Sequence, residues 1–266
     1  MRILFIADLV GEDAIDLALD LLPRIKNSFA IDFTIANAEN ADKGKGVTPQ
    51  IVARLKENNI NCLTSGNHIW NTRKKETLIE NADYLLRPLN YPEGNLGNGS
   101  AIFSLANNIK IGVLNLQGRS FMSSIDCPFQ KGEKEIRKMR SETPNIIIDF
   151  HAEATAEKQA LGWYFDGRVS AVIGTHTHVQ TADERILPKG TAYITDAGMC
   201  GPMDSVIGMD IEKAIKRFIL QSHVYYAMAK NNIYFNGVVV EIDERTGRAR
   251  DIFRLNFNKA GFKDES

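Results

Sequence analysis

Short apolar runs recur along this chain, and each is followed by side chains that can bind a metal ion. These side chains are Asp8 after residues 2–7, Glu39 and Asn40 after 33–36, Asn67 and His68 after 62–64, His151 after 145–150, and His176 and His178 after 169–173. Continuous apolar runs of this length are typical of strands buried on both faces. Function in open α/β sheets lies at the carboxyl ends of strands, so we expect these residues to meet at one sheet edge. The pattern predicts a polynuclear metal site.

Length and composition fit one large α/β domain. The chain has 266 residues, of which 44% are hydrophobic and 24% charged, so it can bury a substantial core. We predict a single domain over residues 1–266, because no linker, repeat or low-complexity segment divides it. The formal net charge of −1 argues against a general nucleic-acid binder, which usually has a strongly basic face. We therefore expect no stable binding of nucleic acid.

The cysteines and the apolar runs also bear on location. Cys62, Cys127 and Cys200 are far apart and form no CxxC pair, which speaks against a zinc knuckle or a redox dithiol. Free thiols in a reducing cytoplasm are the simplest interpretation. Neither a signal-peptide pattern nor a run of about 20 apolar residues is present. We expect a cytoplasmic protein without a membrane partner, and the sequence leaves open whether it forms a homo-oligomer.

Strand and helix patterns alternate in the first quarter of the chain. Helical spacing follows Gly11, where Pro23 should kink or restart the helix, and Thr48-Pro49 supplies an N-cap and a first-turn proline for the next one. This alternation predicts a parallel sheet covered by helices.

The rest of the chain has a mixed pattern. We predict a surface loop over 91–100 and two hairpins, of 101–105 with 110–117 and of 234–242 with 249–257. We also predict strands over 145–150, 169–173 and 191–195, and helices over 153–161 and 211–220. Residues 133–140 should form a solvated helix face, and residues 259–266 a fraying tail.

Each candidate ligand has an ordinary interpretation when it is taken alone. Asp8 would be a helix N-cap, Glu39 a surface carboxylate, Asn67 a turn residue and His151 a satisfied core histidine. Their shared position at strand ends favours the joint interpretation as a metal site. Carboxylate, amide and imidazole ligands together favour Fe, Mn or Zn over Mg or Ca. Two such ions about 3.5–4 Å apart can clamp a phosphoryl group and activate a shared water.

The order of these blocks resembles the calcineurin-like metallophosphoesterase superfamily. The blocks are Asp8, Asn37-Ala38-Glu39-Asn40, Gly66-Asn67-His68, His151 and Gly174-Thr175-His176-Thr177-His178. Longer blocks, including Asp196-Ala197-Gly198-Met199-Cys200-Gly201-Pro202, resemble more narrowly the bacterial YmdB-like branch, from Met1 to about Leu255. The resemblance implies an α/β fold, a four-layer α/β/β/α sandwich of two mixed β-sheets flanked by helices.

The resemblance also implies a ligand set and a function. One ion would be held by Asp8, Glu39, Asn40 and His178, and a second by Glu39, Asn67, His151 and His176. Iron is implied first, manganese second and zinc third. The sequence departs from the wider superfamily because Val10 replaces a histidine and Glu39 replaces the bridging aspartate, changes that the YmdB-like branch shares. His68 is implied as the general acid, with a hydrogen bond to its own loop as the alternative.

The implied activity is hydrolysis of a small phosphodiester such as a 2′,3′-cyclic nucleotide. The alternative is a regulatory protein with a metal-stabilised fold and weak residual phosphatase or phosphodiesterase activity. A metal-dependent amidohydrolase is disfavoured, because its His-x-His pair comes on the first strand, whereas here that pair comes late. The sequence identifies no substrate-binding residue.

Three further features remain open. Lys43-Gly44-Lys45-Gly46 follows the ligand segment and either meets a substrate phosphate or forms a solvated loop. Arg119 either lines the mouth of the site or pairs on the surface. His223 is expected on the helix that begins at Ile211, in a structural role.

Overall fold

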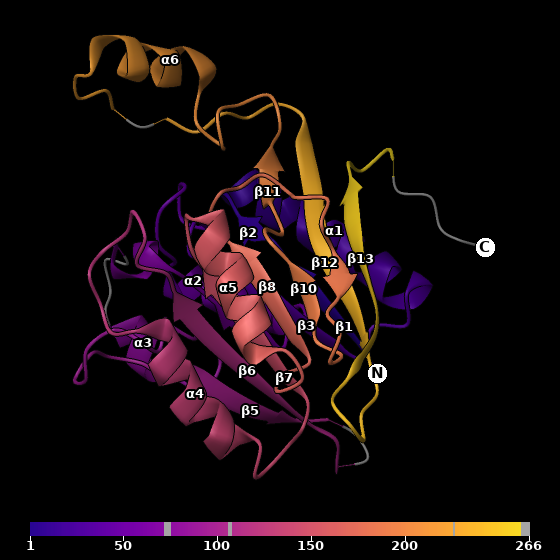
Figure 1. Cartoon of the computed structure of the whole chain (residues 1–266). Coiled ribbons are helices and arrows are strands. Elements are labelled where there is room, and N and C mark those ends of the chain that lie inside the picture. Colours follow the sequence, from indigo (N-terminus) through magenta and orange to yellow (C-terminus); the bar gives the residue numbers. More distant parts are fainter. Residues whose placement is uncertain (72–75, 106–107, 226, 262–266) are drawn as a thin grey trace.

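The computed structural model describes residues 1–71, 76–105, 108–225 and 227–261. The helical elements are α1 (Glu12–Ser28), α2 (Pro49–Glu57), the 3-10 turn η1 (Asn67–Asn71), α3 (Glu76–Glu80), α4 (Pro128–Met139), α5 (Thr155–Phe165) and α6 (Ile211–Leu220). The described strands form two mixed sheets (Figure 1).

The first sheet combines strands from near the beginning and near the end of the chain. Its strands are β1 (Arg2–Ile6), β2 (Asp8–Leu9), β3 (Phe33–Asn37), β4 (Cys62–Thr64), β11 (Met199–Pro202), β12 (Ile233–Ile242) and β13 (Ala249–Phe257). Strands β1, β3 and β4 are parallel, as the alternating pattern predicts. Strand β12 runs antiparallel between β1 and β11 and pairs with β13 as the predicted hairpin.

The second sheet comes from the middle of the chain. Its strands are β5 (Ser100–Ser104), β6 (Lys110–Gln117), β7 (Ile146–His151), β8 (Ala171–Thr175), β9 (Arg185–Ile186) and β10 (Ala192–Ile194). Strands β6, β7, β8 and β10 are parallel, whereas β5 and β9 are antiparallel edge strands. The predicted β5–β6 hairpin is confirmed, although Ala106 and Asn107 of its turn lie outside the described residues.

Three apolar clusters separate four layers. The central cluster joins the inner faces of the two sheets, for example Phe5 of β1 with Ile173 of β8. A second cluster packs α1 and α2 on the outer face of the first sheet, and a third packs α4 and α5 on the outer face of the second. The expected α/β/β/α sandwich is confirmed (Figure 1).

Helix α1 continues through Pro23, so the helix does not restart there, and the alternative of a kink stays a prediction. Two other local predictions were wrong. Helix α4 is not only a solvated face, because Ile136 and Met139 are buried against the second sheet. His223 lies beyond the end of α6 and is exposed. The tail 259–266 is untested beyond residue 261, where the described residues end.

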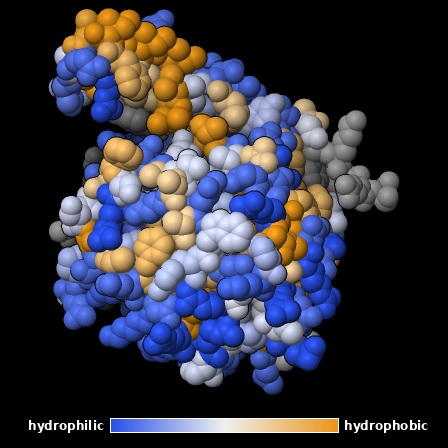
Figure 2. Space-filling model, in the orientation of Figure 1, coloured by the Kyte–Doolittle hydropathy of each residue, from blue (hydrophilic) through white to orange (hydrophobic). Residues whose placement is uncertain are grey.

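The segment around α6 projects from the body of the molecule (Figure 1). Its outer surface is strongly hydrophobic in Figure 2, where Ile215, Phe218 and Ile219 of α6 are exposed. No described helix is long and apolar enough to cross a membrane.

Candidate metal centre

The strand ends of both sheets bring the predicted ligands together. Asp8 begins β2 directly after β1, and Glu39 and Asn40 follow β3. Asn67 begins η1 after β4, His151 ends β7, and His176 and His178 follow β8. Each of these residues lies within hydrogen-bonding distance of at least one other. The expectation that residues from 8 to 178 meet is therefore confirmed, but they come from two sheets and not from the edge of one sheet, as the sequence predicted.

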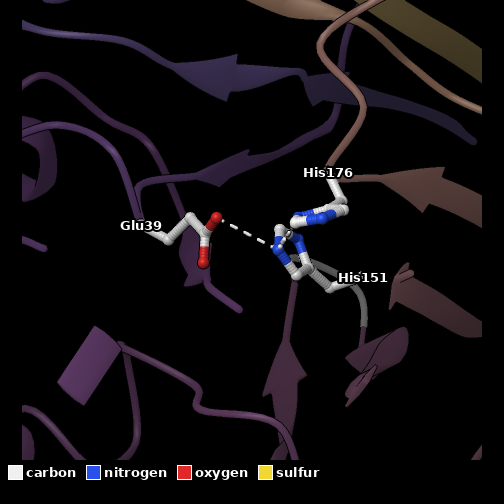
Figure 3. Close-up of side chains that lie close together, drawn as sticks. All are labelled: Glu39, His151 and His176. Carbon is white, nitrogen blue, oxygen red and sulfur yellow. Dashed lines mark hydrogen bonds and ion pairs between the residues drawn. The ribbon is translucent and has the colours of Figure 1, made fainter. Parts of the chain in front are cut away.

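The Nε2 atom of His151 lies at the centre of one half of the site. Within 3.2 Å of it are Glu39 Oε1 at 3.0 Å, His176 Nδ1 at 3.0 Å and Asn67 Oδ1 at 3.2 Å. Figure 3 shows Glu39, His151 and His176 pointing toward one another from three different segments. Ligand atoms of these three side chains all lie within 4.8 Å of one another.

The opposite ring nitrogen of His151 is held by the protein. Thr175 Oγ1 donates to Asp149 Oδ1 at 2.7 Å, so its lone pair is free to accept a hydrogen bond from His151 Nδ1 at 3.0 Å. The proton of the neutral ring is thus placed on Nδ1, and the lone pair of Nε2 points into the site. Sequence reasoning missed Thr175 and Asp149 in this role, although Thr175 lies in the motif block 174–178 and Asp149 in the predicted strand 145–150.

Asp8, Asn40 and His178 form the other half of the site. His178 Nδ1 donates to the backbone oxygen of Ile207 at 2.9 Å, and its Nε2 lies 3.1 Å from Asn40 Nδ2. Asp8 Oδ2 accepts from the backbone of His176 at 3.1 Å, whereas Asp8 Oδ1 is buried and has no hydrogen-bond partner. A buried carboxylate oxygen without a partner is costly unless a cation or donor satisfies it.

This donor set fits a transition-metal site. Carboxylate oxygens, an amide oxygen and imidazole nitrogens converge, and each can offer a lone pair to a cation, an imidazole once its facing nitrogen has lost its proton. Metal-binding histidines usually donate a hydrogen bond from their other ring nitrogen to a protein acceptor, as His151 and His178 do. The unsatisfied Asp8 Oδ1 adds a further lone pair. No described cysteine belongs to the cluster.

The pKa shifts reflect dense packing of charge. Burial by itself raises the pKa of Glu39, but the charge and hydrogen bond of His151 outweigh it and bring the pKa to about 2. Burial lowers the pKa of His151, and Glu39 reverses this and raises it to about 9. Burial and the charge of His151 lower the pKa of His176 to about 3. Burial also raises the pKa of Asp8 and lowers that of His178.

The loop after β8 carries local backbone strain. His176 and His178 have φ angles of 103° and 64°, in the region that favours glycine. Such conformations cost about 1–3 kcal/mol each and persist only where surrounding contacts impose them. The turn places the two imidazoles in different halves of the site, which is one of the two arrangements that a His-x-His spacing allows.

His68 lies at the border of the site. Its side chain is 30% exposed, its Nδ1 is 2.7 Å from Asn40 Oδ1, and its backbone N–H donates to Glu39 Oε2 at 3.0 Å. Burial lowers the pKa of His68, and the nearby positive charge of Lys45 adds to that lowering. The backbone hydrogen bond fits the alternative loop role, but the side chain is also open to a ligand.

A buried ion pair that the sequence did not predict supports the loop after β8. Lys158 Nζ of α5 donates to Asp196 Oδ2 at 2.6 Å, and both side chains are almost fully buried. Asp196 also accepts from the backbone N–H of Thr177 at 3.0 Å, between the two histidines. No spacing pattern marks a lysine on one helix as the partner of an aspartate after a distant strand.

Two other charged groups lie near the site. Glu153 Oε2 is 3.1 Å from His176 Nε2, a contact that sequence reasoning also missed. Arg119 is exposed, and its backbone N–H donates to Glu157 Oε1 at 2.9 Å. This contact involves its backbone and gives its side chain no place in the cluster.

Comparison with known proteins agrees with this geometry. The family model described as "YmdB-like protein" matches residues 4–255. A Bacillus subtilis protein named "2′,3′-cyclic-nucleotide 2′-phosphodiesterase" is 48% identical over 258 residues, covering 97% of each chain. A Mycoplasma pneumoniae structure titled as a novel phosphatase is 37% identical with a TM-score of 0.90, covering 97% of this chain and 93% of that one.

A more distant structure shows the fold alone. The calcineurin-like phosphoesterase YfkN from Bacillus subtilis is 13% identical with a TM-score of 0.58, covering 98% of this chain and 91% of that one. The expected family is therefore confirmed by a model match over most of the chain. With its fold, its strand-end cluster and these relatives, the chain belongs to the YmdB-like family.

Proposed function

We propose that this protein is a metal-dependent phosphodiesterase whose substrates are 2′,3′-cyclic nucleotides or similar small phosphodiesters. The observation that carries the proposal is the convergence of lone pairs around His151 Nε2, together with the unsatisfied buried oxygen of Asp8. The name of the 48% identical relative supports the substrate class.

The proposed ligands divide into two sets that share Glu39. Asp8, Glu39, Asn40 and His178 hold one ion, and Glu39, Asn67, His151 and His176 hold the other. Mixed carboxylate, amide and imidazole sites suit first-row ions. Among these ions the family resemblance implies iron first, followed by manganese and then zinc. When bound, such ions stabilise charge on a phosphoryl group and lower the pKa of water so that it can act as a nucleophile.

Asn40 links the ligand set to His68. Its Oδ1 now faces His68 Nδ1, and its Nδ2 faces Glu39 and His178. An amide oxygen has two lone pairs, so Asn40 Oδ1 can accept the Nδ1 hydrogen of His68 and still offer a lone pair to a cation. A doubly protonated His68 that is held in this way carries its second proton on Nε2 and can give it to a leaving oxygen, as a general acid does.

The test compares wild-type protein with His68→Ala and Glu39→Ala on 2′,3′-cyclic AMP, with metal content measured for each. His68→Ala should retain its metal and lose about 10²–10⁴-fold in kcat, the usual contribution of a general acid. Glu39→Ala should lose both metal and activity, because Glu39 belongs to both ligand sets. A His68→Ala variant with wild-type turnover would contradict the acid role, and a metal-loaded wild-type protein without activity would contradict the proposed function.

The remaining expectations are part of the same proposal. Residues 1–266 act as one domain, which the apolar cluster shared by the two sheets supports. The protein works in the cytoplasm on a small phosphorylated substrate, without a membrane or nucleic-acid partner.

A further inference from the structure

A cavity of about 440 Å³ lies between the projecting α6 segment and the loop that follows β3. Lys45 of that loop lines one side, and Arg217 of α6, with Gln221, Ser222 and His223 after it, lines the other. The α6 segment stands out from the body in both Figure 1 and Figure 2. None of the described side chains that line the cavity is acidic.

Both walls of this cavity are attached to the candidate metal centre. The loop that carries Lys45 folds back on the ligand segment, because the N–H of Gly44 donates to the oxygen of Asn40 at 3.1 Å and that of Gly46 donates to the oxygen of Glu39. On the other wall, Ile207 accepts a hydrogen bond from His178 at 2.9 Å, and Met209, two residues further on, lines the cavity. Each wall is therefore hydrogen-bonded to a segment that carries proposed ligands, Glu39 and Asn40 on one side and His178 on the other.

The lining has the chemistry of a phosphate site. Arg217 and Lys45 supply two positive charges from opposite walls, and Ser222, Gln221 and His223 supply further hydrogen-bonding groups. A guanidinium binds phosphate through paired hydrogen bonds, and an ammonium adds a compact charge. The solvated-loop interpretation of Lys45 does not explain why an arginine from a distant helix faces the same cavity.

We propose that this cavity binds a second phosphate group of the substrate, next to the phosphodiester that is cleaved. The inference rests on the proposed function and adds a substrate class to it. A 2′,3′-cyclic nucleotide with a 5′-phosphate has such a group, and so does a short oligonucleotide that ends in a 2′,3′-cyclic phosphate. Both present a phosphate one sugar away from the reacting one.

The test measures kcat/KM on 2′,3′-cyclic AMP, on its 5′-phosphorylated form and on a dinucleotide that ends in a 2′,3′-cyclic phosphate. Hydrogen bonds to charged groups contribute about 1.5–3 kcal/mol, so a second phosphate should raise kcat/KM about 10–100-fold. Preference for the 5′-phosphorylated form alone would identify a terminal phosphate as the ligand, and preference for the dinucleotide alone would identify an internucleotide phosphate.

Arg217→Gln and Lys45→Gln should each reduce the ratio of kcat/KM between two-phosphate and one-phosphate substrates about tenfold, because each removes one charged contact. Lys216→Gln is the matched control, since it removes a charge from α6 but does not line the cavity. The ratio should be the same in Lys216→Gln as in the wild type.

A wild-type enzyme that cleaves all three substrates with equal kcat/KM would overturn this inference and leave the proposed function intact. Binding of adenosine 5′-monophosphate, measured by calorimetry, separates the two failures. If no substrate is cleaved but Arg217→Gln weakens this binding about tenfold, the cavity stands and the proposed function fails. If binding is equal in the wild type, Arg217→Gln and Lys216→Gln, the cavity has no phosphate site.

Discussion

His151 and His178 are oriented in the same way by different acceptors. Each ring donates through Nδ1, His151 to the Thr175 hydroxyl and His178 to the backbone of Ile207. The Nε2 atom of each ring is thereby directed toward the cluster. Metal affinity at such a site depends on these outer contacts as well as on the ligands themselves.

Removing the contact to His151 should weaken metal binding. Thr175→Val keeps the size of the side chain but loses the hydroxyl, so the Nδ1 proton loses its acceptor. We expect metal affinity to fall about 10–100-fold, measured by competition with a chelator. Thr143→Val is the control, because it makes the same change of side chain far from the cluster. The hydroxyl of Thr143 donates to the backbone oxygen of Lys110. Equal affinity in Thr175→Val and the wild type would contradict the orienting role.

The buried pair of Lys158 and Asp196 predicts a non-additive effect on stability. Lys158→Met leaves the Asp196 carboxylate buried without its partner, which should cost about 3–5 kcal/mol in the free energy of unfolding. Lys158→Met combined with Asp196→Asn removes both charges and should cost less than Lys158→Met alone. Urea denaturation of Lys158→Met, Asp196→Asn and the double variant measures the three losses in the free energy of unfolding. A double variant whose loss equals the sum of the single losses would show that the two side chains do not interact.

At the scale of elements, the turn after β4 packs directly against the end of β7. A Cβ atom added to Gly66 would lie 2.1 Å from the ring of His151, closer than real contacts allow. Gly66→Ala should therefore displace His151 and reduce metal content, as measured by elemental analysis. Gly112→Ala is the control, because the added Cβ comes too close only to the flexible end of Met139, at 2.7 Å, and its next neighbour, Ile146, lies at an ordinary contact distance of 3.5 Å. Full metal content in a folded Gly66→Ala protein would show that this close approach does not position His151.

The sequence predicts the long elements better than the short ones. Strands such as β3 and β7 are continuous apolar runs, so burial on both faces is visible in their composition. Strands β2, β9 and β11 have two to four residues, too few for any periodicity, and were not predicted. The buried face of α4 was missed because Gly132 contributes to it without a side chain and leaves few apolar positions to recognise.

At the scale of the whole molecule, the sequence predicts which residues converge but not how they are supported. Because the carboxyl ends of parallel strands share an edge, the strand-end ligands from 8 to 178 could be grouped from the sequence, but their division between two sheets could not be predicted. Support by Lys158, by the Thr175 hydroxyl and by the backbone of Ile207 depends on contacts between elements that are distant in sequence. Such contacts follow from the packing of the four layers and leave no local pattern.

The central claim is that strand ends of both sheets hold two transition-metal ions through one shared carboxylate. Anomalous diffraction from crystals of the protein loaded with manganese tests it directly. We expect two anomalous peaks on either side of Glu39, one near His151 and His176 and the other near Asp8 and His178. Both peaks should be lost in Glu39→Ala. A well-ordered crystal without anomalous density among these side chains, after loading at saturating manganese, would contradict it.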